Sequence, residues 1–222
     1  MMILRKPLGE GNVVYVCAAR VDSASWKIQV VKRDAGATAS AVCPATGMAI
    51  NAPFFDMQTL TPIGLLVIDG KKIAPRYNGP CVYGDWGVFV LRGTTPQIIA
   101  GLDHLPADAV CGVQCAPLLV INGTIPPFKS KSPALRAAVG IDAQGRTLFA
   151  VSQRNELTFA QWAMILRDDL GCVNALNLDG GPSAQLAAGD HRKVILDGCS
   201  VPVFLTAEPM DTKPATTTPA QQ

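Results

Sequence analysis

Short apolar segments, broken every few residues by Gly, Pro, Asn or Asp, constrain this chain more than any other feature. Such segments, bounded by turn residues, are typical of β-strands. Asp69-Gly70 and Asn122-Gly123 are dipeptides typical of tight hairpin turns. The pattern therefore predicts a sheet-rich fold, with strands within residues 12–18, 26–32, 64–68, 87–91, 96–100, 117–121, 137–141 and 147–152.

One segment instead has helical spacing. Apolar residues recur three and four positions apart after Thr158, and Gly171 ends the pattern. We expect one prominent helix over about 158–170, opened by Thr158 as N-cap and packed on the sheet. A shorter helix is expected over 183–186. The fold class predicted is α+β.

The length and composition favour one globular domain. The chain has 222 residues, of which 49% are hydrophobic and 16% charged, so it can bury a substantial core. We place that domain at residues 1–208 and expect residues 209–222, which are almost without apolar side chains, to form a disordered tail.

The charge pattern argues against a nucleic-acid partner. The net charge is +2, and the densest basic clusters are only two residues long. No apolar run is long enough to predict a membrane span. Residues 13–19 favour a strand over a secretory leader, so we expect a soluble, cytoplasmic protein and leave an exported (periplasmic or secreted) form as the alternative.

Cysteine usage favours thiols. Seven cysteines form no Cys-x-x-Cys pair, so they do not mark a zinc site. Buried reduced thiols are the favoured state, with one or two disulfides in an exported form as the alternative.

The strongest local motif runs from Asn177 to Ser183. Strand spacing puts the Asn177 and Asp179 side chains on one face, and Gly180-Gly181 permits a sharp turn close to a ligand. An amide and a carboxylate above exposed N–H groups would suit an anion or a sugar. A simple turn is the alternative.

Two common hydrolase motifs are missing from the sequence. The segment around Ser183 lacks the final glycine of a nucleophile elbow, and no phosphate-binding loop of the G-x-x-x-x-G-K type occurs. His104 and His191 are the only histidines, and both lie in turn-like segments, which disfavours a Ser–His or Cys–His enzyme.

Three weaker features precede this motif. The pair Phe54-Phe55 is typical of a core and lies between Asn51 and Asp56, while Gln114 lies at the entrance of an apolar segment. Arg136 opens another apolar segment, where a charge is costly without a partner. A phosphate and a structural salt bridge are equally good partners on this evidence.

In order and spacing, these pieces resemble the phosphodiester glycosidase family, over roughly residues 12–205. The matching motifs are Asn51-x-x-Phe54-Phe55-Asp56, Gln114-x-x-Pro117-x-Leu119-Val120-x-Asn122-Gly123, Arg136-x-Ala138-Val139-Gly140, Thr158 at a helix start, and Asn177-Leu178-Asp179-Gly180-Gly181-x-Ser183. The last is quite specific. The chain departs from the family at Ala52-Pro53, where two glycines are frequent, and at Gln161, where a glutamate is frequent.

The resemblance implies hydrolysis of the bond between a sugar's anomeric carbon and a phosphodiester, with a small-molecule or glycan sugar phosphate, or a nucleotide-linked sugar, as substrate. Arg136 would bind the phosphate, and Asp179 would activate water or stabilise the anomeric centre. The catalytic set expected is Asp179, Arg136 and Asn177. The substrate-binding set expected is Asn51, Gln114, Gly180, Gly181, Ser183 and Thr158.

Several alternatives stay open at this point. Asp56, Asp85 and Asp142 are equal candidates for a partner carboxylate. No cofactor is indicated, and a divalent cation is compatible with the acidic residues although no ligand motif marks one. The same pocket could bind a sugar phosphate without cleaving it, or the sheet could be a structural scaffold.

Overall fold

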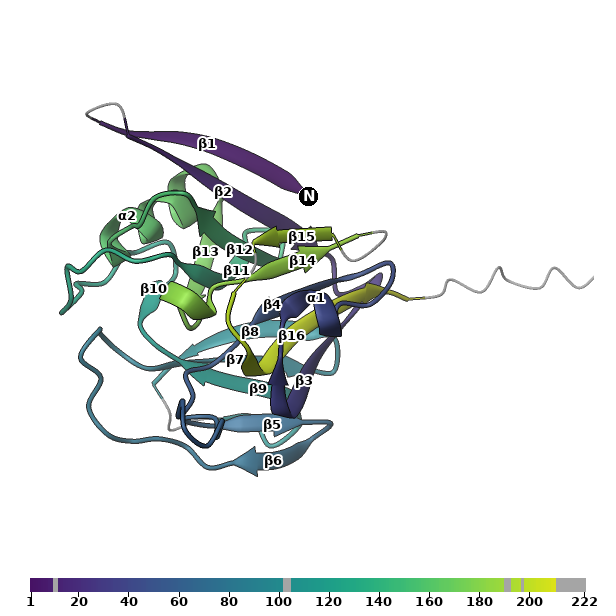
Figure 1. The fold of residues 1–222 in the computed structure, drawn as a ribbon. Coiled ribbons are helices and arrows are strands. Elements are labelled where there is room, and N and C mark those ends of the chain that lie inside the picture. Colours follow the sequence, from purple (N-terminus) through teal and green to yellow (C-terminus); the bar gives the residue numbers. More distant parts are fainter. Residues whose placement is uncertain (10–11, 102–104, 190–192, 197, 211–222) are drawn as a thin grey trace, which may run out of the picture.

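The computed structural model describes residues 1–9, 12–101, 105–189, 193–196 and 198–210. His104, His191 and nearly all of the expected tail at 209–222 lie outside these residues. In the described part, sixteen strands form three sheets, and every strand pairing is antiparallel (Figure 1). The sheet-rich fold predicted from the broken apolar segments is confirmed, and each of the eight expected segments contains a strand.

The first sheet has six strands and carries the helix. Its order is β1 (Met2–Gly9), β2 (Asn12–Val21), β12 (Thr147–Gln153), β11 (Ala137–Asp142), β13 (Cys172–Asn177) and β10 (Leu118–Val120).

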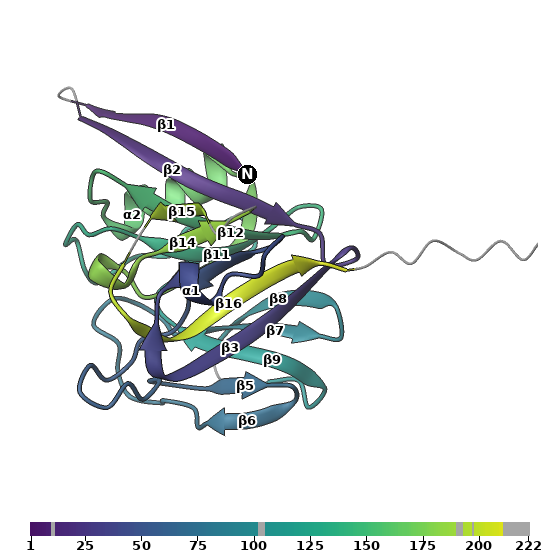
Figure 2. The ribbon, with the colours of Figure 1, turned by 45° about the vertical axis from the view of Figure 1, so that its right-hand side comes forward.

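The second and third sheets have five strands each. The second runs β15 (Lys193–Leu196), β14 (Leu186–Ala188), β4 (Met48–Asn51), β16 (Val201–Pro209) and β3 (Trp26–Ala37). The third runs β6 (Lys71–Ala74), β5 (Leu66–Ile68), β9 (Ala109–Cys115), β7 (Gly87–Arg92) and β8 (Thr95–Ala100). The long strands β3 and β16 lie side by side across the second sheet (Figure 2).

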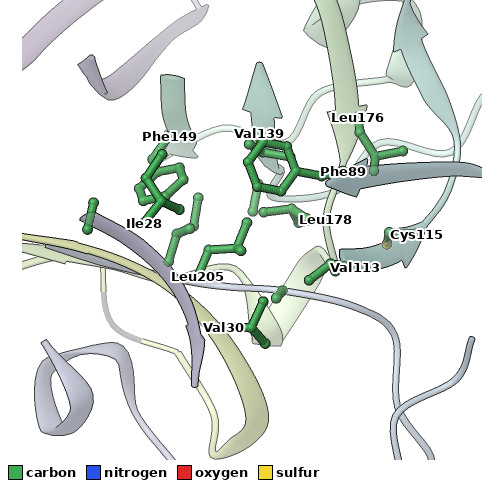
Figure 3. Packing of buried hydrophobic residues seen from close by; sticks show 14 of the residues in the cluster. Ile28, Val30, Phe89, Val113, Cys115, Val139, Phe149, Leu176, Leu178 and Leu205 are labelled. Atoms are coloured by element: carbon green, nitrogen blue, oxygen red, sulfur yellow. The ribbon is translucent and has the colours of Figure 1, made fainter. Parts of the chain in front are cut away.

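The inner strands β11 and β12 of the first sheet are buried on both faces because their side chains alternate between two apolar clusters. In β12, Leu148 and Ala150 pack with the helix, whereas Phe149 and Val151 pack with the other two sheets. All three sheets contribute to this central core, where Val139, Leu205 and Phe89 meet (Figure 3). The described residues therefore share one main core.

The helix predicted over about 158–170 is confirmed. It consists of α2 (Phe159–Met164) and a following π-helical turn (Ile165–Asp169). The Leu170 N–H donates to the Ile165 carbonyl five residues back, at 3.0 Å, and Gly171 leaves the helix with a φ of +70°. Its apolar face packs on the first sheet.

The shorter helix predicted at 183–186 is wrong. A single 3₁₀ turn (Gly181–Ser183) with Pro182 near its start is followed by extended backbone at Ala184. Leu186 then pairs with Ile50 of β4, so strand pairing overrides the local preference. The remaining helix is a short one, α1 (Ala39–Val42). Within the described ranges, no helix is both long and apolar enough to span a bilayer.

Candidate active site

A cavity of about 260 Å³ lies where the end of β13 meets the start of α2 and three loops. It is lined by Phe54, Tyr83, Ser130, Ser132, Pro133, Ala134, Arg136, Phe159, Asn177, Asp179, Gly180 and Gly181. Five residues of the expected site thus line one cavity: Arg136, Asn177, Asp179, Gly180 and Gly181.

The backbone of Asp179 is held by the end of β4. Its N–H donates to the Ala52 carbonyl at 3.0 Å, and its carbonyl accepts from Asn51 Nδ2 at 2.7 Å. Asn51 Oδ1 in turn accepts from the Gln185 N–H at 3.1 Å. Asn51 is buried and does not line the cavity, so it positions Asp179 from behind.

The Asp179 carboxyl lies in surroundings that favour its neutral form. Burial raises its pKa to about 6, against the opposing effect of hydrogen bonds from the Ser183 hydroxyl and the Gly180 N–H. The side chain remains charged at neutral pH but accepts a proton at only slightly lower pH. A carboxylate with such a pKa is suited to general-base chemistry.

Arg136 is a buried cation without an ion pair. The residue is only 5% exposed. Among the described residues, no carboxylate lies within 4.0 Å of its guanidinium. Nε donates to the Leu157 carbonyl at 2.8 Å, and Nη2 donates to the Ser132 carbonyl at 2.7 Å. The guanidinium also lies over the Phe159 ring, 3.7 Å from its centroid.

The third nitrogen of Arg136, Nη1, makes no hydrogen bond within the described residues and lies beside Gly180. Burial lowers the pKa of this guanidinium to about 10, so it stays protonated at neutral pH. A buried charge of this kind is costly unless a counter-ion joins it. The arrangement is therefore suited to an anionic ligand.

Asn177 has a free acceptor at the same place. Its Nδ2 donates to the carbonyls of Ala116 and Leu178, whereas its buried Oδ1 has no partner in the described part of the chain. An unpaired buried acceptor costs about 1–3 kcal/mol. A ligand hydroxyl donating to Oδ1 would remove that cost.

The two glycines leave room that other residues would fill. A Cβ on Gly180 would lie 2.7 Å from the Leu135 carbonyl oxygen, and Gly181 has a φ of +57°. The turn after Asp179 therefore requires glycine at position 180 for close packing and glycine at position 181 for its positive φ.

Comparison with known proteins decides the family. The sequence matches the family model described as phosphodiester glycosidase over residues 45–209, more than half of the chain. The chain belongs to the phosphodiester glycosidase family. No curated protein matches this sequence.

Solved structures share the phosphodiester glycosidase fold of this chain. The zebrafish N-acetylglucosamine-1-phosphodiester alpha-N-acetylglucosaminidase catalytic domain, auto-inhibited by its pro-peptide, has a TM-score of 0.73 and 18% identity, covering 92% of this chain and 80% of that one. A hypothetical protein from Synechocystis has a TM-score of 0.64 and 16% identity, covering 94% and 61%. A putative exported protein from Burkholderia pseudomallei has a TM-score of 0.56 and 12% identity, covering 89% and 74%.

Gln114 and Thr158, two of the residues expected to bind substrate, contact the chain itself instead. Gln114 is fully buried: its Oε1 accepts from the Leu65 and Tyr77 N–H groups, and its Nε2 donates to the Tyr77 carbonyl at 2.7 Å. It therefore holds the loop that carries Tyr83. Thr158 caps α2, as predicted, and does not line the cavity.

The family's frequent glutamate position is structural here. Gln161 Oε1 accepts from the Thr158 N–H at 2.9 Å, while the Gln161 N–H donates to Thr158 Oγ1 at 3.3 Å, so the two form a capping box. Gln161 does not line the cavity. The Ala52-Pro53 departure also leaves the backbone contact to Asp179 intact, because Ala52 provides only its carbonyl.

None of the three other candidate carboxylates lines the cavity. Asp56 accepts from the backbone of its own turn, at Gln58 and Thr59. The buried Asp142 carboxylate pairs with the partly exposed Arg146 guanidinium at 2.8 Å. Asp85 lines a different cavity. Among the described lining residues, Asp179 is thus the sole carboxylate.

One side of the cavity is aromatic, which was not predicted from the sequence. Phe54 packs against the main core, as expected, but also lines the cavity, and Tyr83 and Phe159 line it as well. The Phe54 and Tyr83 ring centroids lie 5.7 Å apart, as do those of Tyr83 and Phe159. Aromatic residues flanked by Gly and Pro in the loop of residues 75–86 were the available signal.

Proposed function

We propose that this protein hydrolyses the bond between the anomeric carbon of a sugar and a phosphodiester. One observation carries the proposal: Asp179, half-buried with a pKa near neutral, lines the same cavity as Arg136, a buried cation without an ion pair. Membership of the phosphodiester glycosidase family supports the same reaction.

The proposed reaction is a single displacement. Asp179 takes a proton from a water molecule as the water oxygen forms a bond to the anomeric carbon. The bond between that carbon and the ester oxygen breaks, and its electron pair leaves with the phosphate. Because a phosphate monoester is a good leaving group, little acid assistance is needed. One displacement also inverts the anomeric configuration.

The remaining residues stabilise charge and orient the sugar. Arg136 offers Nη1 to the phosphate as negative charge develops on it. Asn177 Oδ1 accepts from a sugar hydroxyl, and the Phe54 and Tyr83 rings cover the sugar's apolar face. Asn51, Gln114, Ser183 and Thr158 act from behind, by holding the groups that touch the substrate.

The deciding experiment uses a panel of sugar-1-phosphodiesters and UDP-N-acetylglucosamine in ¹⁸O-labelled water. Mass spectrometry of the phosphate product identifies the bond that breaks. Unlabelled phosphate with free sugar means cleavage at the anomeric carbon, as proposed. Labelled phosphate means attack at phosphorus and would contradict the proposal.

Matched variants tie the reaction to the cavity. Asp179→Asn should abolish turnover. Arg136→Lys should lower kcat/KM by about 10²-fold, because one ammonium cannot keep both carbonyl contacts of the guanidinium and also reach the phosphate. The exposed pair Arg92 and Asp108, whose atoms lie 3.0 Å apart, supplies the controls Arg92→Lys and Asp108→Asn. Intact substrates that still raise the melting temperature would identify a binding protein instead.

A further inference from the structure

The Gln185 side chain is fully buried outside the candidate active site and joins three separate segments of the chain. Its Oε1 accepts from the Ala39 N–H at 2.6 Å, at the start of α1. Its Nε2 donates to the Ser183 carbonyl at 3.2 Å and to the Cys199 carbonyl at 2.9 Å. One N–H donor at the oxygen and two carbonyls at the nitrogen fix the orientation of the amide, and both of its hydrogens are used.

The contact with α1 is a helix cap. Thr38, the N-cap residue, makes no side-chain hydrogen bond to the first turn of this helix. Gln185, 146 residues away in sequence, provides the acceptor for the Ala39 N–H instead. The amide is therefore anchored on an element separate from the turn that contains Ser183.

The other end of the amide lies against the turn that follows Asp179. Ser183 ends the 3₁₀ turn, and the Cys199 N–H donates to the Pro182 carbonyl at 2.8 Å. A Cβ on Gly198 would lie 2.9 Å from the Pro182 carbonyl oxygen and 3.1 Å from Gln185 Nε2. Residues 198–199 thus pack closely against the turn, and the amide is hydrogen-bonded to both segments.

This turn places the Ser183 hydroxyl at the Asp179 carboxylate, to which it donates. Ser183 Oγ also lies 3.7 Å from Cys199 Sγ, so both segments held by the amide meet at this hydroxyl. A hydroxyl has one hydrogen, so it donates to Asp179 only while the turn keeps it in place. The Asp179 backbone is held by a different route, because Asn51 accepts from the backbone N–H of Gln185.

We propose that Gln185 is a positioning residue for Asp179: its side-chain amide holds the turn so that the Ser183 hydroxyl donates to the carboxylate. Gln185 does not line the cavity and acts on Asp179 through Ser183. The inference rests on the proposed function, in which Asp179 is the general base. Loss of the amide removes a hydrogen bond from the charged carboxylate and leaves it protonated up to higher pH.

The other titratable groups near the Asp179 carboxyl are not joined to Gln185. Arg136 and Tyr83 line the same cavity, and Cys115, at the end of β9, interacts electrostatically with Asp179. Within the described residues, none of these three side chains is hydrogen-bonded to the Gln185 amide. A change of this amide should therefore reach the carboxyl through the turn.

Carbon-13 NMR of the aspartate carboxyl groups tests the inference without turnover. The Asp179 signal is the one missing from Asp179→Asn, and its titration gives the pKa in each variant. Gln185→Met keeps the length of the side chain but removes the amide, and it should raise the Asp179 pKa by about 0.5–1. Gln114→Met, the same change at another fully buried glutamine, should leave that pKa where it is.

A double-mutant cycle decides whether Gln185 acts through Ser183. In the Ser183→Ala background, Gln185→Met should cause no further rise, because the hydroxyl that the amide positions is already absent. A second rise as large as the one in the wild-type background would overturn this route. Equal Asp179 pKa values in wild type and Gln185→Met would overturn the positioning role itself.

Ala39→Pro displaces the amide without changing Gln185. Proline suits the first residue of a helix after the extended backbone of Thr38, but it lacks the N–H that binds Oε1, and its ring takes the place of that oxygen. We expect the same rise in the Asp179 pKa, which keeps the proposal testable if Gln185→Met does not fold by circular dichroism. An unchanged pKa in Ala39→Pro would contradict the proposal.

The positioning role and the proposed hydrolysis fail in different ways. If the Asp179 pKa moves as expected but no sugar-1-phosphodiester is cleaved, Gln185 positions the carboxyl and the proposed reaction is wrong. If wild type cleaves these substrates and Gln185→Met changes neither the Asp179 pKa nor the acidic limb of kcat/KM, the positioning role is wrong and the hydrolysis stands.

Discussion

At the scale of single residues, Asp179 combines catalytic suitability with a cost to the fold. Its folded-state pKa of about 6 exceeds the ordinary value of 3.8, so the unfolded chain loses this proton first as pH rises. The free energy of unfolding therefore falls between about pH 4 and pH 6 and remains lower above that range. Below both pKa values Asp179 is protonated in the folded and the unfolded chain, so its ionisation does not change the free energy of unfolding.

Asp179→Asn should consequently stabilise the protein while it abolishes turnover. At pH 7.5 we expect a gain of about 1–3 kcal/mol in the free energy of unfolding, because the buried charge is removed. The Asn oxygen can still accept from the Gly180 N–H. Urea denaturation at pH 7.5 and pH 4 measures the gain, which should vanish at pH 4. A variant less stable than wild type at pH 7.5 contradicts this account.

Ser183 should act through Asp179 rather than on the substrate. Its hydroxyl donates to the carboxylate and so lowers the Asp179 pKa, opposing burial. Ser183→Ala should move the acidic limb of the kcat/KM profile from about pH 6 to higher pH, and leave activity above the limb close to wild type. Ser183→Thr should restore the limb. If the pH profile of Ser183→Ala matches that of the wild type, Ser183 has only a structural role.

At the scale of elements, the capping box of α2 supports the site indirectly. Thr158 and Gln161 define where the helix begins. Phe159, the first residue of the helix, packs under the Arg136 guanidinium. Gln161→Glu should keep the box and the activity, whereas Gln161→Ala should lower the free energy of unfolding by about 0.5–1 kcal/mol. Both are checked by thermal denaturation and by kcat. Loss of activity in Gln161→Ala with unchanged stability would argue for a chemical role.

The elements also explain what the sequence could reveal. Apolar runs between turn residues identified the strands, and strand alternation placed Asn177 beside Asp179, because both signals are local. The 3₁₀ turn at 181–183 was missed because Leu186 is recruited by β4, far away in sequence. Tyr83 was missed for the same reason, since its loop reaches the cavity only through long-range contacts.

At the scale of the whole molecule, one core joins all three sheets. Phe89 of the third sheet is fully buried and packs in the same cluster as residues of the other two. We expect a single cooperative unfolding transition. Phe89→Ala should lower the free energy of unfolding by about 3–5 kcal/mol. Circular dichroism and tryptophan fluorescence should give coincident curves in urea. Two separated transitions would show that the sheets unfold independently.

The pairing of β3 with β16 has a consequence for synthesis on the ribosome. β3 ends at Ala37, and its partner begins at Val201, so the early strand is made long before the late one exists. At about 5–20 residues per second, the delay is on the order of ten to thirty seconds. During that interval the nascent chain exposes the backbone edge and the apolar face of β3. A chaperone that shields nascent chains would therefore raise the yield of this protein more than its final stability suggests.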